Sequence, residues 1–168
     1  GKGDDVIIGG DGRGDDTYQG GDGIDQLIYS SAELHNVIIN LRTGTATGVE
    51  IGNDSLTGIE NVTAGHQDDK ITGDAKNNTI DGFSGVDSVY FQGKRSEYTI
   101  SRSNSTEIEI NDSVGERDGK DTLLNVEYIV FMDDSILTST LGDTSAPSST
   151  PAPSPTPAPT PTPAPSST

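Results

Sequence analysis

The sequence predicts an all-β fold: a parallel β-roll, or β-solenoid, of nonapeptide repeats, with a β-rich C-terminal cap and a polyproline-II-like tail. Three observations predict it. A unit of the form Gly-Gly-x-Gly-x-Asp-x-apolar-x recurs, most clearly over residues 20–28. Short stretches of alternating apolar and polar residues follow over residues 91–143, with no convincing amphipathic helix. All nine prolines lie between Pro147 and Pro165.

The repeats form two arrays. The first covers residues 1–28, with a shortened copy at 1–8 and further copies at 11–19 and 20–28, and the glycines at positions 9 and 10 interrupt the period. The second covers residues 64–90, with copies at 64–72, 73–81 and 82–90. An insert, residues 29–63, separates the arrays. A period this short indicates a solenoid in which each unit supplies half a coil.

Each unit divides into a turn and a strand. The glycines allow positive φ angles and close approach of the backbone, so the first six residues form a tight turn with inward-facing carbonyl groups. The last three residues form a short strand with one apolar side chain directed inward. The predicted inward residues are Ile7, Tyr18, Leu27, Ile71, Ile80 and Val89.

The sixth residue of the unit brings an oxygen ligand into the turn. If each unit is half a coil, turns from alternate units stack on one side, and Ca²⁺ fits between their carbonyl groups and Asp side chains. The predicted ligand residues are Gly3, Asp5, Gly14, Asp16, Gly23, Asp25, Asp69, Asn78, Gly85 and Asp87. The alternative is a structural solenoid whose Gly/Asp turns are only tight corners.

Over residues 1–28 and 64–90 the chain resembles the repeats-in-toxin family of calcium-binding parallel β-rolls. Residues 54–63 resemble the connector that often leads into such a repeat block, and residues 91–137 the β-rich segment that often follows. The resemblance implies a protein secreted by bacteria that folds in millimolar calcium. Gln67, Asp74 and Lys76 stand where the family has glycine, and Asn78 replaces the carboxylate. We therefore expect the turns at 64–69 and 73–78 either to bind calcium weakly or only to help close a neighbouring site.

Composition supports a calcium-dependent fold. The chain has 27 acidic and 10 basic residues, a net charge of −17 and 29% hydrophobic residues. Such a chain tends to stay unfolded unless its carboxylates are neutralised, so folding and calcium binding should be coupled. The acidic surface argues against nucleic acid as a partner. Cysteine is absent, and no apolar run approaches the roughly 18 residues of a membrane span.

The insert and the cap are predicted from short strand-like runs. In the insert, strands are expected at 37–41 and 59–62 with the turn-prone stretch 44–52 between them, as longer coils or as a hairpin across the roll. In the cap, residues 91–143, strands are expected at 98–101, 107–110 and 126–131. The turn at Asp118-Gly119 divides the last two.

The tail, residues 144–168, alternates Pro with Ala, Ser and Thr and carries no charge. It is predicted to be either a flexible linker to another domain or a stalk that carries O-linked glycans. The candidate acceptors are Thr150, Thr156, Thr160 and Thr162. The chain starts inside a repeat and shows no signal peptide, so we expect a mature or fragmentary product.

These features predict a protein that is not an enzyme. His35 and His66 are the only histidines and lie in no catalytic motif, and the repeat accounts for nearly all Asp residues. The favoured function is a secreted structural glycoprotein, a self-assembling subunit of an extracellular filament or cell-surface structure. Its expected partners are calcium, copies of itself and glycans. The alternative is a calcium-dependent folding or secretion module of a larger secreted enzyme or adhesin.

Overall fold

Three-residue strands separated by Gly/Asp turns make up both repeat arrays. The first array forms β1 (Val6–Ile8), β2 (Thr17–Gln19) and β3 (Gln26–Ile28), and the second forms β8 (Lys70–Thr72), β9 (Thr79–Asp81) and β10 (Ser88–Tyr90). The middle residue of each strand is the one predicted to face inward. Four of these residues, in β3, β8, β9 and β10, are fully buried, and Ile7 and Tyr18 pack partly buried against the core.

The remaining strands come from the insert and the cap. The insert forms β4 (Val37–Asn40), β5 (Thr45–Gly48), β6 (Gly52–Thr57) and β7 (Asn61–Thr63). The cap forms β11 (Tyr98–Arg102), β12 (Glu107–Asp112), β13 (Lys120–Leu124), β14 (Tyr128–Val130) and β15 (Ser135–Leu137), with short 3₁₀ turns η1 (Arg95–Glu97) and η2 (Thr138–Thr140).

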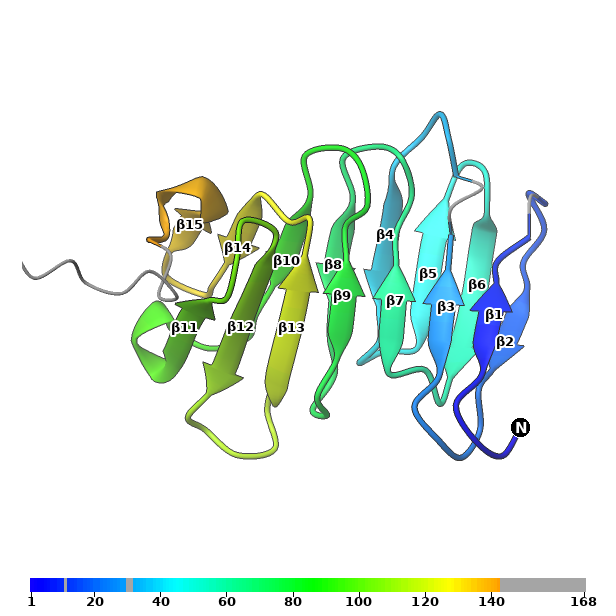
Figure 1. Ribbon diagram of the computed structural model, residues 1–168. Coiled ribbons are helices and arrows are strands. Elements are labelled where there is room, and N and C mark those ends of the chain that lie inside the picture. Colours follow the sequence, from blue (N-terminus) through cyan, green and yellow to red (C-terminus); the bar gives the residue numbers. More distant parts are fainter. Residues whose placement is uncertain (11, 30–31, 143–168) are drawn as a thin grey trace, which may run out of the picture.

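Two sheets face each other, and the chain passes back and forth between them (Figure 1). The first sheet has the order β1-β3-β7-β9-β13-β12-β11, and the second has the order β15-β14-β10-β8-β4-β5-β6-β2. Both are mixed. Parallel pairs link β1, β3, β7, β9 and β13 in one sheet, and β4, β8, β10 and β14 in the other. The prediction of an all-β class is confirmed.

Antiparallel pairs occur where the insert and the cap depart from the repeat. In the second sheet β4, β5 and β6 form a meander, and β6 then pairs with β2 in parallel. The expectation of a simple turn over residues 44–52 was wrong, because β5 lies within it and turns Ala46 into the core. A single small apolar residue gave too weak an alternation to predict a strand. The cap strand β13 was also missed.

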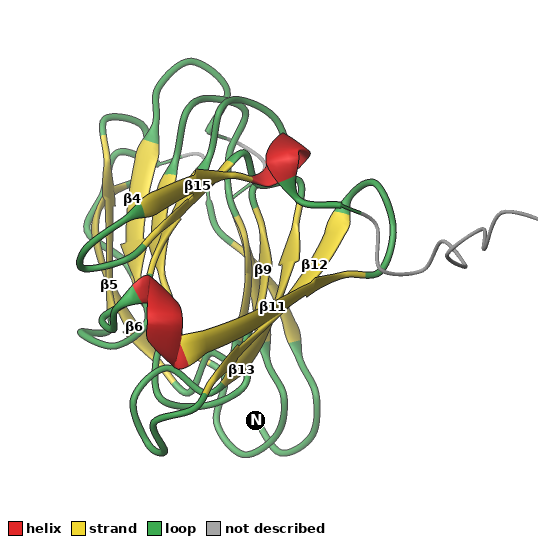
Figure 2. Cartoon of the chain, turned by 90° about the vertical axis from the view of Figure 1, so that its left-hand side faces the viewer, coloured by secondary structure: helices red, strands yellow, loops and turns green. Residues whose placement is uncertain are grey.

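The core lies between the two sheets (Figure 2). At the end formed by the cap, the rings of Phe91, Tyr98 and Phe131 pack with centroid separations of 5.0 to 5.8 Å. The guanidinium groups of Arg95 and Arg117 lie over two of these rings. Figure 2 shows η1 and η2 at this same end. Aromatic side chains and short helical turns therefore close one end of the core.

The structure is a computed structural model and describes residues 1–10, 12–29 and 32–142. The tail, with the candidate glycosylation residues Thr150, Thr156, Thr160 and Thr162, lies outside these described residues. In the described part of the chain, no helix has the length and apolar character needed to cross a membrane.

Replacement of Ile80 tests the packing of the two sheets. Ile80 is fully buried in β9 and sits beside Val62 and Leu123 of the neighbouring strands. Ile80→Ala should lower the free energy of unfolding by about 2–5 kcal/mol, because it leaves a cavity. Ile8→Ala is the control, because Ile8 is 70% exposed, and it should cost less than about 0.5 kcal/mol. Urea denaturation measures both, and equal losses would contradict this packing.

Candidate metal-binding turns

The turns between the sheets stack along two edges of the molecule, and we name each edge after the sheet that its turns enter. The first edge holds the turns that lead into β1, β3, β7, β9 and β13, and the second edge those that lead into β2, β6, β4, β8, β10 and β14. Turns from alternate repeat units, such as those that lead into β1 and β3 or into β8 and β10, are therefore neighbours. The backbone N–H groups in these turns lie beyond the ends of the strand ladders and need other acceptors.

Carboxylates of neighbouring turns accept hydrogen bonds from each other's backbone. In the first array, Asp5 N–H donates to Asp25 Oδ1 and Ile24 N–H donates to Asp4 Oδ1, both at 2.8 Å. A third hydrogen bond, 2.9 Å long, runs from Gln26 N–H to the Asp5 carbonyl oxygen. Each turn thus holds the backbone of the other, and we call this arrangement the reciprocal clamp.

The reciprocal clamp occurs four times among the described residues. In each case a Gly-x-Asp segment on one turn pairs with two adjacent Asp or Asn residues on the other, with N–O distances of 2.8 to 3.0 Å. The pairs are 23–25 with 4–5, 52–54 with 15–16, 85–87 with 68–69, and 119–121 with 77–78. The same backbone contact reinforces all four, at 2.8 to 3.0 Å.

Only glycine fits the first position of each Gly-x-Asp segment. All four glycines have positive φ angles, between 72° and 143°. A Cβ atom there would also overlap a carbonyl oxygen of the facing turn, that of Gly3, Gly14, Gln67 or Lys76. Sequence reasoning identified Gly23 and Gly85 but missed Gly52 and Gly119. Their signal is the pattern Gly-x-Asp-x-apolar, which repeats the second half of the nonapeptide.

Asp25 and Asp87 each have one carboxylate oxygen without a partner. Both side chains are fully buried, and both Oδ2 atoms lack a hydrogen-bond donor among the described residues. A Cβ atom at Gly20 would overlap both Asp25 Oδ2 and the Gly58 carbonyl oxygen, and one at Gly82 would overlap Asp87 Oδ2 and the Asn125 carbonyl oxygen. Each unpartnered oxygen therefore lies near a main-chain carbonyl oxygen of the next turn.

A glutamate lies next to each of these two aspartates, and we call the surroundings of each aspartate its environment. Glu60 Oε2 accepts a hydrogen bond from Asp25 N–H at 3.0 Å, and Glu127 Oε2 accepts one from Asp87 N–H at 2.8 Å. Each glutamate ends a three-residue turn that begins with positive φ, at Gly58 or Asn125. Two oxygen-rich environments of the same construction therefore lie on opposite edges, the Asp25 environment on the first and the Asp87 environment on the second.

The equivalence of these environments is visible in a second internal repeat that sequence reasoning missed. Glu60 and Glu127 occupy the same position in two eleven-residue segments. Each segment begins with the Gly-x-Asp part of a reciprocal clamp and continues into the turn that contains the glutamate. The segments are Gly52-Asn53-Asp54-Ser55-Leu56-Thr57-Gly58-Ile59-Glu60-Asn61-Val62 and Gly119-Lys120-Asp121-Thr122-Leu123-Leu124-Asn125-Val126-Glu127-Tyr128-Ile129. Aligning the two segments would have identified both glutamates.

Asp69 has both carboxylate oxygens satisfied within the protein. Asp69 accepts hydrogen bonds from Val37 N–H and Gly65 N–H, both at 2.7 Å. Asp16 faces Asp54, whose second oxygen accepts a hydrogen bond from the Tyr29 hydroxyl at 2.8 Å. Four further predicted ligands are exposed at the end of the molecule formed by β1 and β2, namely Gly3, Asp5, Gly14 and Asp16.

The turn that contains Asn78 has a lysine ammonium group and no carboxylate at the sixth position of the repeat. The Asn78 amide donates to the Glu60 carbonyl oxygen at 2.8 Å and to Asp74 Oδ1 at 3.2 Å. The Lys76 ammonium lies 2.6 Å from Glu60 Oε1, and this hydrogen bond raises the pKa of Lys76. The turn at 73–78 thus presents a neutral amide and a positive charge where the repeat pattern has a carboxylate.

Burial makes several of these carboxylates costly to ionise. It raises the pKa of Asp87 to about 7 and that of Asp121 to about 8, and it raises the pKa of Asp69. A nearby cation would favour the ionised form. However, no group of three or more acidic or histidine side chains is assembled for a metal within the described ranges. Backbone carbonyl groups would have to supply much of any coordination shell.

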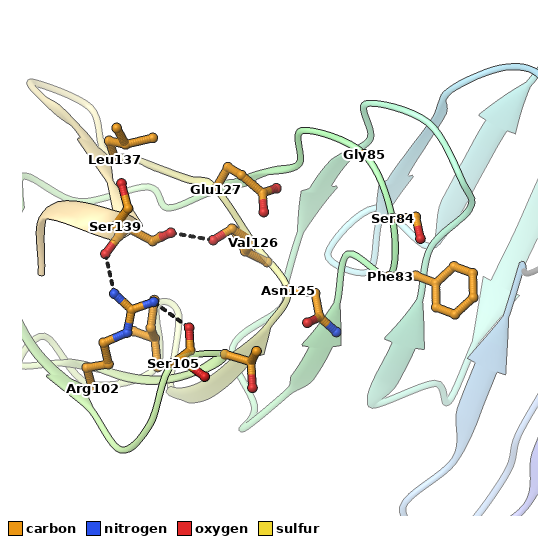
Figure 3. A pocket seen from close by; sticks show the side chains of 13 residues that line it. Phe83, Ser84, Gly85, Arg102, Ser105, Asn125, Val126, Glu127, Leu137 and Ser139 are labelled. Atoms are coloured by element: carbon orange, nitrogen blue, oxygen red, sulfur yellow. Dashed lines mark hydrogen bonds between the residues drawn. The ribbon is translucent and has the colours of Figure 1, made fainter. Parts of the chain in front are cut away.

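A pocket of about 450 Å³ borders the Asp87 environment (Figure 3). Asn125 and Glu127 line it together with Gly85. Arg102, also in its lining, donates to the carbonyl oxygens of Ser105 and Thr138, at 2.6 and 2.8 Å, and so ties η2 to the β11–β12 loop. These contacts give Arg102 a structural role.

No family model matches the chain, and no curated protein is significantly similar to it in sequence. The resemblance to the repeats-in-toxin family therefore stays a prediction that rests on the repeat residues themselves.

The buried Asp87 carboxylate gives a testable pH dependence. Its folded-state pKa lies above the unfolded value of about 3.9, so this group favours folding at low pH, and that contribution is lost as the pH rises from about 4 to about 7. In a chelator, Asp87→Asn should therefore lose less stability than the wild type between pH 5 and 7.5. Denaturation curves at several pH values measure this. Asp22→Asn, at an exposed position, is the control, and parallel curves for wild type and Asp87→Asn would contradict the prediction.

Proposed function

We propose that this protein is a non-catalytic calcium-binding β-roll of the repeats-in-toxin type, with one calcium site at Asp25 and one at Asp87. The observation that carries the proposal is the repeated environment itself. On opposite edges of the molecule, a fully buried aspartate has one oxygen without a partner, a glutamate one turn away and a main-chain carbonyl oxygen close by. Buried unsatisfied oxygens are rare and point to an absent ligand.

The chemistry of the available donors fits calcium. Asp25 with the carbonyl oxygen of Gly58 would hold one ion, and Asp87 and Glu127 with the carbonyl oxygen of Asn125 would hold the other. All are hard oxygen ligands from flexible turns, and Ca²⁺ accepts six to eight such ligands in irregular geometry. With no cysteine in the chain and no histidine in either environment, zinc and copper are poorly matched.

Calcium would also allow this chain to fold. A net charge of −17 opposes compaction, and each bound ion removes two negative charges at the places where carboxylates are buried. Binding free energy then appears as folding free energy, so the protein should gain stability with rising calcium concentration.

Calcium-dependent folding suits a protein that acts outside the cell, where calcium is abundant. We therefore propose a secreted structural subunit that associates through its β-edges, with O-glycans on the tail. The observation that favours association is that each sheet ends at the cap on an edge strand, β11 or β15, whose outer edge pairs with no other strand of the described chain. The alternative function, a folding or secretion module of a larger enzyme or adhesin, uses the same calcium sites.

Calcium stoichiometry tests the two sites. Asp25→Ala and Asp87→Ala should each lose one bound ion relative to the wild type in isothermal titration calorimetry and native mass spectrometry. Asp54→Asn is the matched control, because Asp54 belongs to a reciprocal clamp but has both oxygens occupied by protein donors. It should lower stability without changing the number of ions. Unchanged stoichiometry in both alanine variants would contradict the proposal.

The turn at 73–78 offers a gain-of-function test. Lys76→Gly combined with Asn78→Asp restores the fourth and sixth residues of the repeat, leaving Asp74 unchanged, and removes the ammonium that faces Glu60. The double variant should bind one ion more than the wild type, because a carboxylate then replaces a neutral amide in a stacked turn. Lys76→Gly alone is the control and should not gain the ion. An unchanged count in the double variant would show that the turn lacks other necessary ligands.

A further inference from the structure

The environments of Asp25 and Asp87 are built alike but differ in what lies beyond the glutamate. Beyond Glu60, the next turn along the first edge carries Lys76, whose ammonium group bonds Glu60 Oε1 at 2.6 Å. Beyond Glu127, β15 pairs antiparallel with β14, and the next segment is η2, which donates a backbone hydrogen bond of 2.8 Å to the Glu127 carbonyl oxygen. Glu127 Oε1 accepts no hydrogen bond from the described part of the chain. A lysine therefore closes the first environment, and the second is left open on this side.

The pocket of about 450 Å³ lies on this open side, with Asn125 and Glu127 in its wall (Figure 3). Several polar groups of its lining have no hydrogen-bond partner within the described ranges, namely Glu127 Oε1, Asn125 Oδ1 and the hydroxyl groups of Ser84, Ser105 and Ser139. Ile108, Val126 and Leu137 add apolar surface. A cavity of this size, with a few polar groups placed among apolar ones, is typical of a small-molecule site.

The lining favours a neutral ligand that is rich in hydroxyl groups. The guanidinium group of Arg102 is held by the carbonyl oxygens of Asn104, Ser105, Thr138 and Leu141, at 2.6 to 3.3 Å. An anionic ligand would meet this engaged cation, the Glu127 carboxylate and a chain of net charge −17. Serine hydroxyl groups both donate and accept hydrogen bonds, as the hydroxyl groups of a sugar do.

Phe83 marks the rim of the same pocket with a strained backbone. It stands at the second position of its repeat unit, where the unit at 20–28 has Gly21 with a φ angle of 114°. Phe83 keeps a positive φ of 69° in spite of its bulky side chain, which is rare outside glycine. Its ring is 41% exposed and packs edge-on against the His66 ring, with centroids 4.7 Å apart. Strained residues of this kind cluster at ligand sites.

We propose that this pocket binds a neutral saccharide and that two adjacent hydroxyl groups of one sugar complete the coordination of calcium at Asp87, an inference that rests on the proposed function. Asp87 Oδ1 and Glu127 Oε2 each accept a backbone hydrogen bond of 2.8 Å, so each carboxylate has one oxygen left for a metal. With the Asn125 carbonyl oxygen they supply fewer ligands than the six to eight that Ca²⁺ takes. Hydroxyl groups of a ligand in the pocket can supply others, because Asn125 and Glu127 belong to both the calcium site and the pocket wall.

NMR titration of the ¹⁵N-labelled full chain tests the inference. The probes are methyl α-mannoside and methyl β-galactoside, which both carry adjacent hydroxyl groups. In calcium, at least one of them should cause saturable shifts of amide signals that are confined to the pocket lining, at 83–85, 105–106, 125–127 and 137–139. Fully O-methylated forms of the same sugars, which have no hydroxyl group to offer, should cause none. The shifts should also be absent in a chelator.

The two calcium environments provide a matched pair of variants. Asp25→Ala and Asp87→Ala should each lose one bound ion, but only Asp87→Ala should lose saccharide binding. Asp25→Ala should retain it, because the pocket borders the Asp87 environment and Lys76 closes the other one.

Ser139→Tyr blocks the pocket without changing a proposed calcium ligand. Ser139 is exposed and its hydroxyl group has no partner in the described chain, so the fold and the number of bound ions should stay unchanged. Saccharide binding should weaken by roughly tenfold or more, because the phenol ring takes up volume that the sugar needs. Ser135→Tyr is the matched control, since Ser135 is exposed in β15 but outside the lining, and it should have no effect.

The outcomes separate the two proposals. Uptake of both ions without saccharide-induced shifts, or equal binding by wild type and Ser139→Tyr, would overturn the saccharide inference alone. Binding that persists in a chelator, or that Asp25→Ala and Asp87→Ala weaken equally, would overturn the role given to the ion. Tighter binding of glucuronate than of either neutral glycoside would overturn the assignment of a neutral ligand. Absence of calcium uptake by the wild type would overturn the proposed function itself.

Discussion

The structure depends on a hydrogen-bond constraint at the turns. Six-residue turns leave backbone N–H groups beyond the reach of the strand ladders, and a buried N–H without an acceptor is costly. The reciprocal clamp meets this need with carboxylates from the neighbouring turn, as Asp25 does for Asp5. Because each clamp also requires a glycine against a facing carbonyl group, it fixes the register of the two turns that it joins.

The same solution creates an electrostatic difficulty, because it buries carboxylates in a chain that is already strongly acidic. Two kinds of partner within the protein relieve it. Tyr29 donates its hydroxyl hydrogen to Asp54, and Lys76 supplies an ammonium group to Glu60. Asp25 and Asp87 have neither kind of partner on their second oxygens. The calcium proposal assigns a cation to the two places where the protein supplies no donor of its own.

Much of the fold could be predicted from local pattern. Leu27, Ile71, Ile80 and Val89 lie in the core as the repeat predicts, because a strand of three residues leaves one inward position. The meander β4–β5–β6 could not be placed, since it pairs Gly52 with a turn far away in sequence. Glu60 and Glu127 were missed because their three-residue turns break the nine-residue spacing. The clamp between 77–78 and 119–121 was likewise hidden by the β11–β12 hairpin that separates its halves.

Anomalous diffraction from crystals grown in calcium would test the central claim most directly. The account predicts two strong peaks, one beside Asp25 Oδ2 and Glu60 and one beside Asp87 Oδ2 and Glu127, with main-chain carbonyl oxygens completing each shell. Peaks confined to exposed carboxylates, or a donor from the protein or a water molecule bound to both Oδ2 atoms with no metal nearby, would contradict it.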